Sequence, residues 1–186
     1  MKKVITIAIL FFLTIAIKSV QAQNELLTAS EVGDFSTIKK CIERGDDVNF
    51  FLYHPHSSAD DHHSCNHSEN RTALFWAVLR NDYEIAEYLL LNGADANLHI
   101  IHGTTVLHWA ATKGNIQMIK LLLNYKANVN EKDDKGRTPL MLACFYNFST
   151  DAADLLMLSG ASSKEKDALG NDFEFYIQNS LKKNNQ

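Results

Sequence analysis

The sequence predicts an all-α solenoid of about four helix-turn-helix repeats, followed by a C-terminal half-repeat cap. Three observations support this prediction. The apolar pattern recurs about every 33 residues, each unit contains two short helical runs, and the eight glycines fall at only three positions of the unit. Glycine tolerates positive φ and closes helices, so these positions mark turns. A period of this length is typical of stacked repeats, which present an extended binding surface.

Residues 1–22 are predicted to be a secretory signal peptide. A short basic start, Met1–Lys3, precedes 14 apolar or near-apolar residues at Val4–Ile17, and compact residues follow at Val20–Ala22. This order is the one a signal peptidase recognises, so we expect cleavage after Ala22. The apolar run is too short to cross a bilayer comfortably, so we expect no stable membrane anchor. The protein would then act in the periplasm or be secreted.

Residues 23–186 are expected to form a single repeat domain. Trp76 and Trp109 occupy the same position of neighbouring units, 33 residues apart. Each unit has two apolar helical faces that it cannot bury alone, so neighbouring units must stack. The aligned repeats are residues 24–49, 72–97, 105–130 and 138–164.

The repeated motifs resemble the ankyrin-repeat family, whose unit reads roughly TPLHLAA, a turn, an apolar second helix and GADVN. This chain has TVLHWAA at Thr105–Ala111, TPLMLAC at Thr138–Cys144 and NGADAN at Asn92–Asn97. The resemblance implies finger loops on one side of the stack. It also implies a non-enzymatic adaptor or inhibitor that binds another protein through its fingers and concave face. Together with the predicted signal peptide at residues 1–22, the resemblance suggests an exported bacterial protein.

Register within the repeat predicts which side chains are buried. Trp109 and Leu122 should lie in the core, and His108 should form structural hydrogen bonds within or between turns. Cys41 and Cys144 take positions of buried small side chains three repeats apart, which is too far for a disulfide.

The two ends of the stack are predicted to be caps. Ser30, Glu31 and Lys40 replace apolar residues in the first repeat, so we expect them to be exposed at the N-terminal end. Residues 165–183 restart the pattern and stop after one helix, Asp172–Lys182, which predicts the half-repeat cap.

The first finger, residues 50–71, carries an insertion of 15 residues and five of the eight histidines. In an extended segment alternate residues share a face, and imidazole and thiolate groups suit Zn²⁺ or Cu²⁺. This pattern supports a periplasmic metal-binding or oxidative-stress protein as the alternative function, and clustered histidines could also sense pH. The predicted metal ligands are His54, His56, His63, Cys65 and His67.

The fingers are also the predicted contact surface for a protein partner. The net charge of −4 falls to −7 when the leader is removed with its three lysines, which argues against nucleic acid and anionic membranes as partners. No catalytic motif is recognisable, so we expect a monomeric binding protein that is not an enzyme and needs no cofactor unless the histidines bind metal. The predicted partner-binding residues are Phe51, Tyr53, His54, His56, His99, Ile101 and His102.

Overall fold

The computed structural model describes residues 21–51, 71–146 and 150–184 of the chain. The fold is all-α, as the sequence predicts, and it contains helical residues at 21–32 and one 3₁₀ turn, η1 (Ile101–Gly103). The labelled α-helices are α2 (Phe35–Arg44), α3 (Ala73–Arg80), α4 (Tyr83–Leu91), α5 (Val106–Thr112), α6 (Ile116–Asn124), α7 (Pro139–Tyr146), α8 (Thr150–Leu158) and α9 (Phe173–Asn184).

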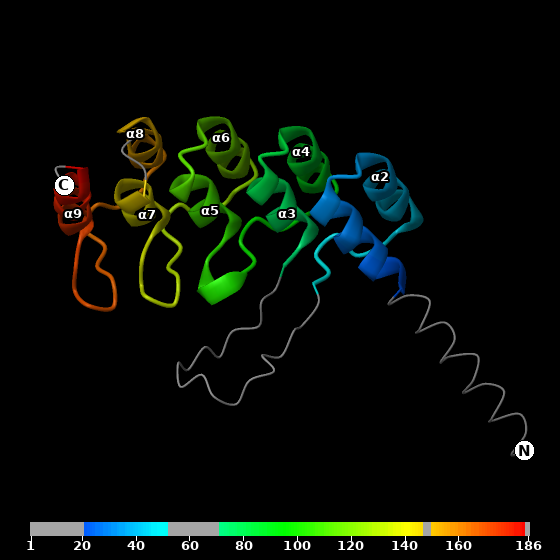
Figure 1. Ribbon diagram of the computed structural model, residues 1–186, viewed down its shortest axis with the longest axis horizontal. Helices are drawn as coiled ribbons and strands as arrows, with labels where there is room; N and C mark the ends of the chain where they lie inside the picture. Colours follow the sequence, from blue (N-terminus) through cyan, green and yellow to red (C-terminus); the bar gives the residue numbers. More distant parts are fainter. Residues whose placement is uncertain (1–20, 52–70, 147–149, 185–186) are drawn as a thin grey trace, which may run out of the picture.

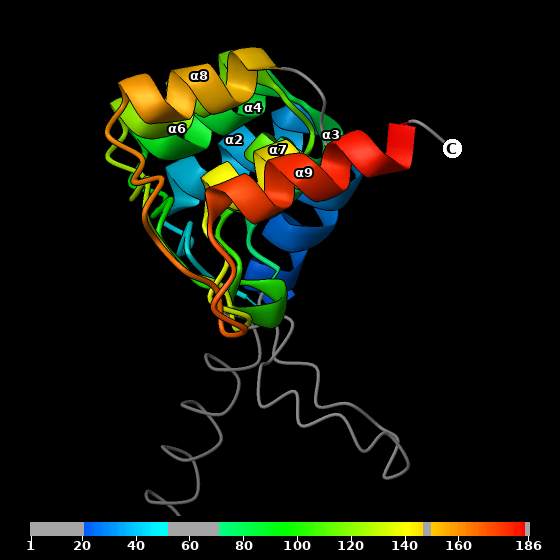
Figure 2. The same ribbon diagram turned by 90° about the vertical axis from the view of Figure 1, so that its left-hand side faces the viewer.

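The helices form two layers (Figure 1). Helices α3, α5, α7 and α9 make the first-helix layer, and α2, α4, α6 and α8 make the second-helix layer. The fingers between α4 and α5, α6 and α7, and α8 and α9 project from the side of the first-helix layer. Figure 2, which views the stack from its end, shows these fingers lying behind one another. The architecture is an ankyrin-repeat solenoid.

Short polar side chains start several of these helices. Asp34 accepts a hydrogen bond from the Thr37 amide at 3.2 Å, and Thr72 accepts one from the Phe75 amide at 3.2 Å. Each bond satisfies one of the amides that a helix leaves unpaired at its N-terminus. Gly45 ends α2 with φ 91°, a left-handed conformation that other residues adopt only at a cost.

The core runs continuously between the two layers. Leu122 is fully buried, which agrees with the predicted register, and Cys41 and Cys144 are free and buried. Burial raises the pKa of the Cys144 thiol to about 11. Trp109 differs from its prediction, because it is only half-buried and packs against the edge of the core.

The first repeat corrects one prediction. Ser30 is 1% exposed rather than solvent-facing, and its hydroxyl donates to the Leu26 carbonyl at 2.8 Å. This local bond satisfies the hydroxyl and allows a serine to be buried between helices. Glu31 and Lys40 are exposed, as predicted.

A ladder of asparagines joins successive repeats. The asparagine that ends each of the first three repeats donates from its amide nitrogen to a carbonyl of the next repeat and accepts an amide hydrogen there, over 2.7 to 3.1 Å. Both ends of each side-chain amide are therefore used, which fixes the spacing of the repeats. The bonds link Asn49 to Gly93 and Asp95, Asn97 to Lys126 and Asn128, and Asn130 to Gly160 and Ser162.

The stack ends on α9, which packs against α7. The buried Tyr176 of α9 donates its hydroxyl to the Asp167 carboxylate at 2.7 Å, which ties the helix to the finger before it. Among the described residues, none of the helices combines the length and the apolar character needed to cross a bilayer.

Candidate protein-binding groove

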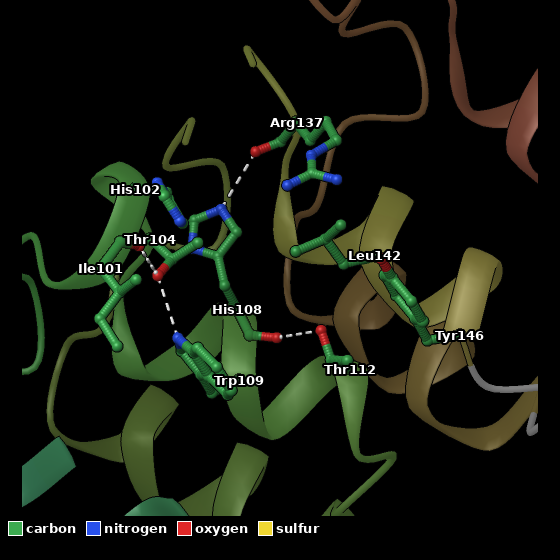
Figure 3. Close-up of a pocket in the computed structure, with 9 residues that line it drawn as sticks. All are labelled: Ile101, His102, Thr104, His108, Trp109, Thr112, Arg137, Leu142 and Tyr146. Atoms are coloured by element: carbon green, nitrogen blue, oxygen red, sulfur yellow. Dashed lines mark hydrogen bonds between the residues drawn. The ribbon is translucent and has the colours of Figure 1, made fainter. Parts of the chain in front are cut away.

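A groove of about 310 Å³ lies in the first-helix layer between the third and fourth repeats (Figure 3). Side chains of α5 form one side, and two side chains of α7 form the other. The finger before α5 and Arg137, two residues before α7, close the end nearest the fingers. The residues lining it are Ile101, His102, Thr104, His108, Trp109, Thr112, Arg137, Leu142 and Tyr146.

The finger beside the groove is held by the next finger along the stack. His102 has φ 55°, and its carbonyl accepts a hydrogen bond from the Asp134 amide at 3.2 Å. Gly103, with φ 68°, lies so close to the next finger that a Cβ there would come within 3.0 Å of the Asp134 amide nitrogen. The position therefore requires glycine both for its backbone angle and for its space.

Trp109 is oriented by Thr104. The Trp109 indole N–H donates to Thr104 Oγ1 at 3.0 Å, and the Thr104 hydroxyl donates to the Ile101 carbonyl at 2.6 Å. The Trp109 ring also meets the Phe75 ring edge to face at a centroid distance of 5.5 Å. Because its one polar atom is satisfied, Trp109 presents apolar ring surface to the groove.

His108 forms the buried floor of the groove and joins two repeats. Its Nδ1 accepts a hydrogen bond from the Thr105 amide at 3.0 Å, so the proton lies on Nε2, which donates to the Arg137 carbonyl at 3.0 Å. Burial lowers the pKa of His108 below 6.5, although the bond to Arg137 opposes this shift. The prediction that His108 forms structural hydrogen bonds is confirmed.

Arg137 is anchored by the finger that precedes it. Its Nε and Nη2 donate to Asp133 Oδ2 at 2.8 and 2.6 Å, and Asp133 Oδ1 accepts the amides of Lys135 and Arg137 at 2.9 and 2.8 Å. The Asp133 carboxylate is 1% exposed, so this charge is buried with its partners. The finger is a tight turn held by hydrogen bonds to one aspartate.

The far side of the groove is formed by Leu142 and Tyr146. Leu142 occupies the repeat position that is tryptophan at 76 and 109, and the smaller side chain helps to leave space beside Trp109. Tyr146 is 54% exposed, and its ring meets the Phe145 ring at 4.8 Å. An exposed aromatic ring beside an apolar hollow is a typical anchor for a protein partner.

The predicted partner-binding residues have different environments. Ile101 and His102 both line the groove, where Ile101 is half-buried and His102 is exposed. Phe51 is 38% exposed at the start of the first finger. His99 Nε2 lies 3.1 Å from Glu131 Oε1 of the next finger, so His99 also links two fingers.

The remaining predicted site residues lie outside the described part of the chain. They include all of the predicted metal ligands. Within residues 21–51, 71–146 and 150–184, no group of three or more His, Cys, Asp or Glu side chains is placed to hold a metal ion. The residues concerned are Tyr53, His54, His56, His63, Cys65 and His67.

Comparison with known proteins identifies the family. Residues 74–167 match the family model for ankyrin repeats, with three copies. Inversin of Gallus gallus is 46% identical over 72 residues, which is 39% of this chain and 6% of that protein. An ankyrin repeat protein of fowlpox virus is 31% identical over 133 residues, covering 71% of this chain and 35% of that protein. Serine/threonine-protein kinase 12 of Arabidopsis thaliana is 38% identical over 88 residues, covering 47% of this chain and 19% of that protein. The chain therefore spans only a minor part of these relatives, and the similarity lies in the repeats. The chain belongs to the ankyrin-repeat family.

Proposed function

We propose that this chain is a non-enzymatic adaptor or inhibitor that binds another protein through the groove and the neighbouring fingers. Ankyrin repeats are generally protein–protein interaction modules, which supports the general class. The observation that carries the proposal is the groove itself, where Trp109 and Tyr146 offer ring surface on either side of an apolar hollow.

The groove suits an apolar side chain of a partner. Its volume of about 310 Å³ is at the small end of ligand pockets, so it accommodates one or two side chains rather than a whole cofactor. Trp109 and His108 have their polar atoms bonded within the protein, so these side chains are already ordered and would lose little conformational freedom on binding. Aromatic residues in such positions commonly contribute most of the binding energy.

The cellular location and the oligomeric state of the protein are also proposals. The leader-like residues 1–22 support export to the periplasm or medium of a bacterium. The acidic net charge supports a monomer that does not bind nucleic acid. The alternative proposal, a periplasmic metal-binding or oxidative-stress protein, rests on the histidines at positions 54 to 67.

A pull-down from the native compartment tests the proposed function. Tyr146→Ala removes an exposed ring from the groove, and Tyr83→Ala is the matched control, because Tyr83 is 42% exposed on α4 of the second-helix layer. The partner should be captured by the wild type and by Tyr83→Ala but lost or greatly reduced with Tyr146→Ala. Equal capture by both variants would contradict the proposal.

A further inference from the structure

The charged side chains of the first-helix layer are positive across the middle of the stack. Helices α3, α5 and α7 contain no aspartate or glutamate. Helix α3 ends on Arg80, and Lys113 follows α5 directly. In the second-helix layer the charge is mixed, because α4 and α8 carry acidic residues and no basic ones, whereas α2 and α6 carry lysines. This basic surface occurs on a chain whose net charge is −4.

The basic residues follow the tryptophans at helical spacing. Arg80 comes four residues after Trp76, and Lys113 comes four residues after Trp109, so each pair lies on one helical face. The two pairs are 33 residues apart in equivalent repeat positions. They therefore form an aromatic row (Trp76 and Trp109) beside a cationic row (Arg80 and Lys113). Both tryptophans are half-buried, and both cations are exposed.

The bonds made by the cationic row orient it and leave its charge available. Arg80 Nη1 donates to the Glu31 carbonyl at 3.3 Å, and Lys113 Nζ donates to the Leu79 carbonyl at 2.6 Å. Carbonyl acceptors carry no net charge. Arg80 also lies 3.6 Å from the Asp82 carboxylate in an exposed pair, whereas Lys113 has no salt bridge to a carboxylate of the described residues. Lys113, which directly follows the groove residue Thr112, is therefore the stronger site for an incoming anion.

We propose that the partner presents an extended acidic segment to this surface, an inference that rests on the proposed function. An apolar side chain of the segment enters the groove beside Trp109, and its carboxylates meet Lys113 and Arg80. Stacked helices lie about 10 Å apart, and an extended segment in the polyproline II conformation advances about 3.1 Å per residue and turns every third side chain to the same face. The segment thus crosses one repeat in about three residues, so its apolar and acidic residues should each recur at about that interval.

Phage display of random peptides tests the proposed preference for acidic segments, because it assumes no partner sequence. The full chain, Lys113→Glu and Lys120→Glu are used as targets in parallel. Lys120 is the matched control, because it is an exposed lysine of the same repeat on α6 in the second-helix layer. Peptides selected on the full chain and on Lys120→Glu should be rich in Asp and Glu, with apolar residues at about three-residue intervals. Lys113→Glu should lose this preference.

The affinity of the best acidic peptide gives a second measurement. Fluorescence anisotropy should show binding weakened about two- to fivefold by Lys113→Gln, the range for one exposed ion pair, and unchanged by Lys120→Gln. Added salt should weaken binding to the wild type more than binding to Lys113→Gln.

The outcomes separate this inference from the proposed function. Selected peptides without an acidic excess, or an equal excess on Lys113→Glu and Lys120→Glu, would overturn the acidic-segment inference. Failure to select any peptide on the full chain would also overturn it. In each case the proposed function stands if Tyr146→Ala still loses the native partner, and it falls only if that capture is unaffected.

Discussion

Replacing His108 by glutamine should remove a defined part of the pH dependence of stability. His108 is 0% exposed, and in the folded chain its neutral ring bonds to the Thr105 amide and the Arg137 carbonyl. Glutamine does not titrate, and its side-chain amide retains a donor for the Arg137 carbonyl. The Thr105 amide loses its acceptor, so we expect His108→Gln to cost about 1 to 3 kcal/mol at neutral pH.

The sign of the pH effect follows from the direction of the pKa shift. Burial lowers the pKa of folded His108 below 6.5, so the unfolded chain binds a proton at a higher pH than the folded chain does. Stability due to this group is therefore fully present above about pH 6.5 and falls as the pH drops toward the folded pKa. At pH 5.5 the loss has an upper limit of about 1.4 kcal/mol, the free energy of one pKa unit.

Urea unfolding followed by far-UV circular dichroism measures this effect. The free energies of unfolding of wild type and His108→Gln are compared at neutral pH and at about pH 5.5. The wild type should lose more stability than the variant, by up to about 1.4 kcal/mol. His102→Gln retains His108 and is the control for replacing a histidine. An equal loss in wild type and His108→Gln would refute the burial of His108 as a neutral ring.

Three further predictions concern the core, the fingers and the histidine-rich segment. Leu122→Ala should cost about 2 to 5 kcal/mol, because Leu122 is fully buried, and a thermal melt equal to that of wild type would contradict the register. Gly136→Ala should lower the melting temperature more than Gly160→Ala. Both glycines have positive φ, but only at Gly136 would a Cβ approach backbone, at 2.8 Å, so equal effects would argue against close finger contact. Calorimetry should show Zn²⁺ or Cu²⁺ binding that weakens below about pH 6 and is lost in His63→Ala/His67→Ala, whereas dissociation constants weaker than about 100 μM would reject the metal proposal.

The repeat pattern was sufficient to predict the fold. Apolar side chains at helical spacing determine which face of each helix is buried, so Leu122 and the two buried cysteines follow from register alone. The single C-terminal helix was also predicted, and α9 begins at Phe173, one residue after the expected start. Ser30 was predicted wrongly because its hydroxyl is satisfied by a local carbonyl, which allows burial of a residue that usually lies at the surface.

The groove could be predicted only in part. Ile101 and His102 were identified from their place in a finger, but Tyr146 and Leu142 were not. Tyr146 and Leu142 line the groove because they lie opposite side chains of α5 in the neighbouring repeat. The repeat pattern shows which residues are equivalent, but it does not show which side chains of adjacent repeats face each other. The asparagine ladder did leave a signal, because Asn49, Asn97 and Asn130 each end a repeat, but the signal became interpretable only when their hydrogen bonds were seen.

Photo-crosslinking from the groove tests the central claim most directly. A photoreactive phenylalanine analogue replaces Tyr146 in one variant and Tyr83 in another, and each is illuminated in the native compartment. The account predicts one defined protein adduct from position 146 and no such adduct from position 83. An adduct of equal yield from both positions, or from position 83 alone, would contradict binding through the groove between Trp109 and Tyr146.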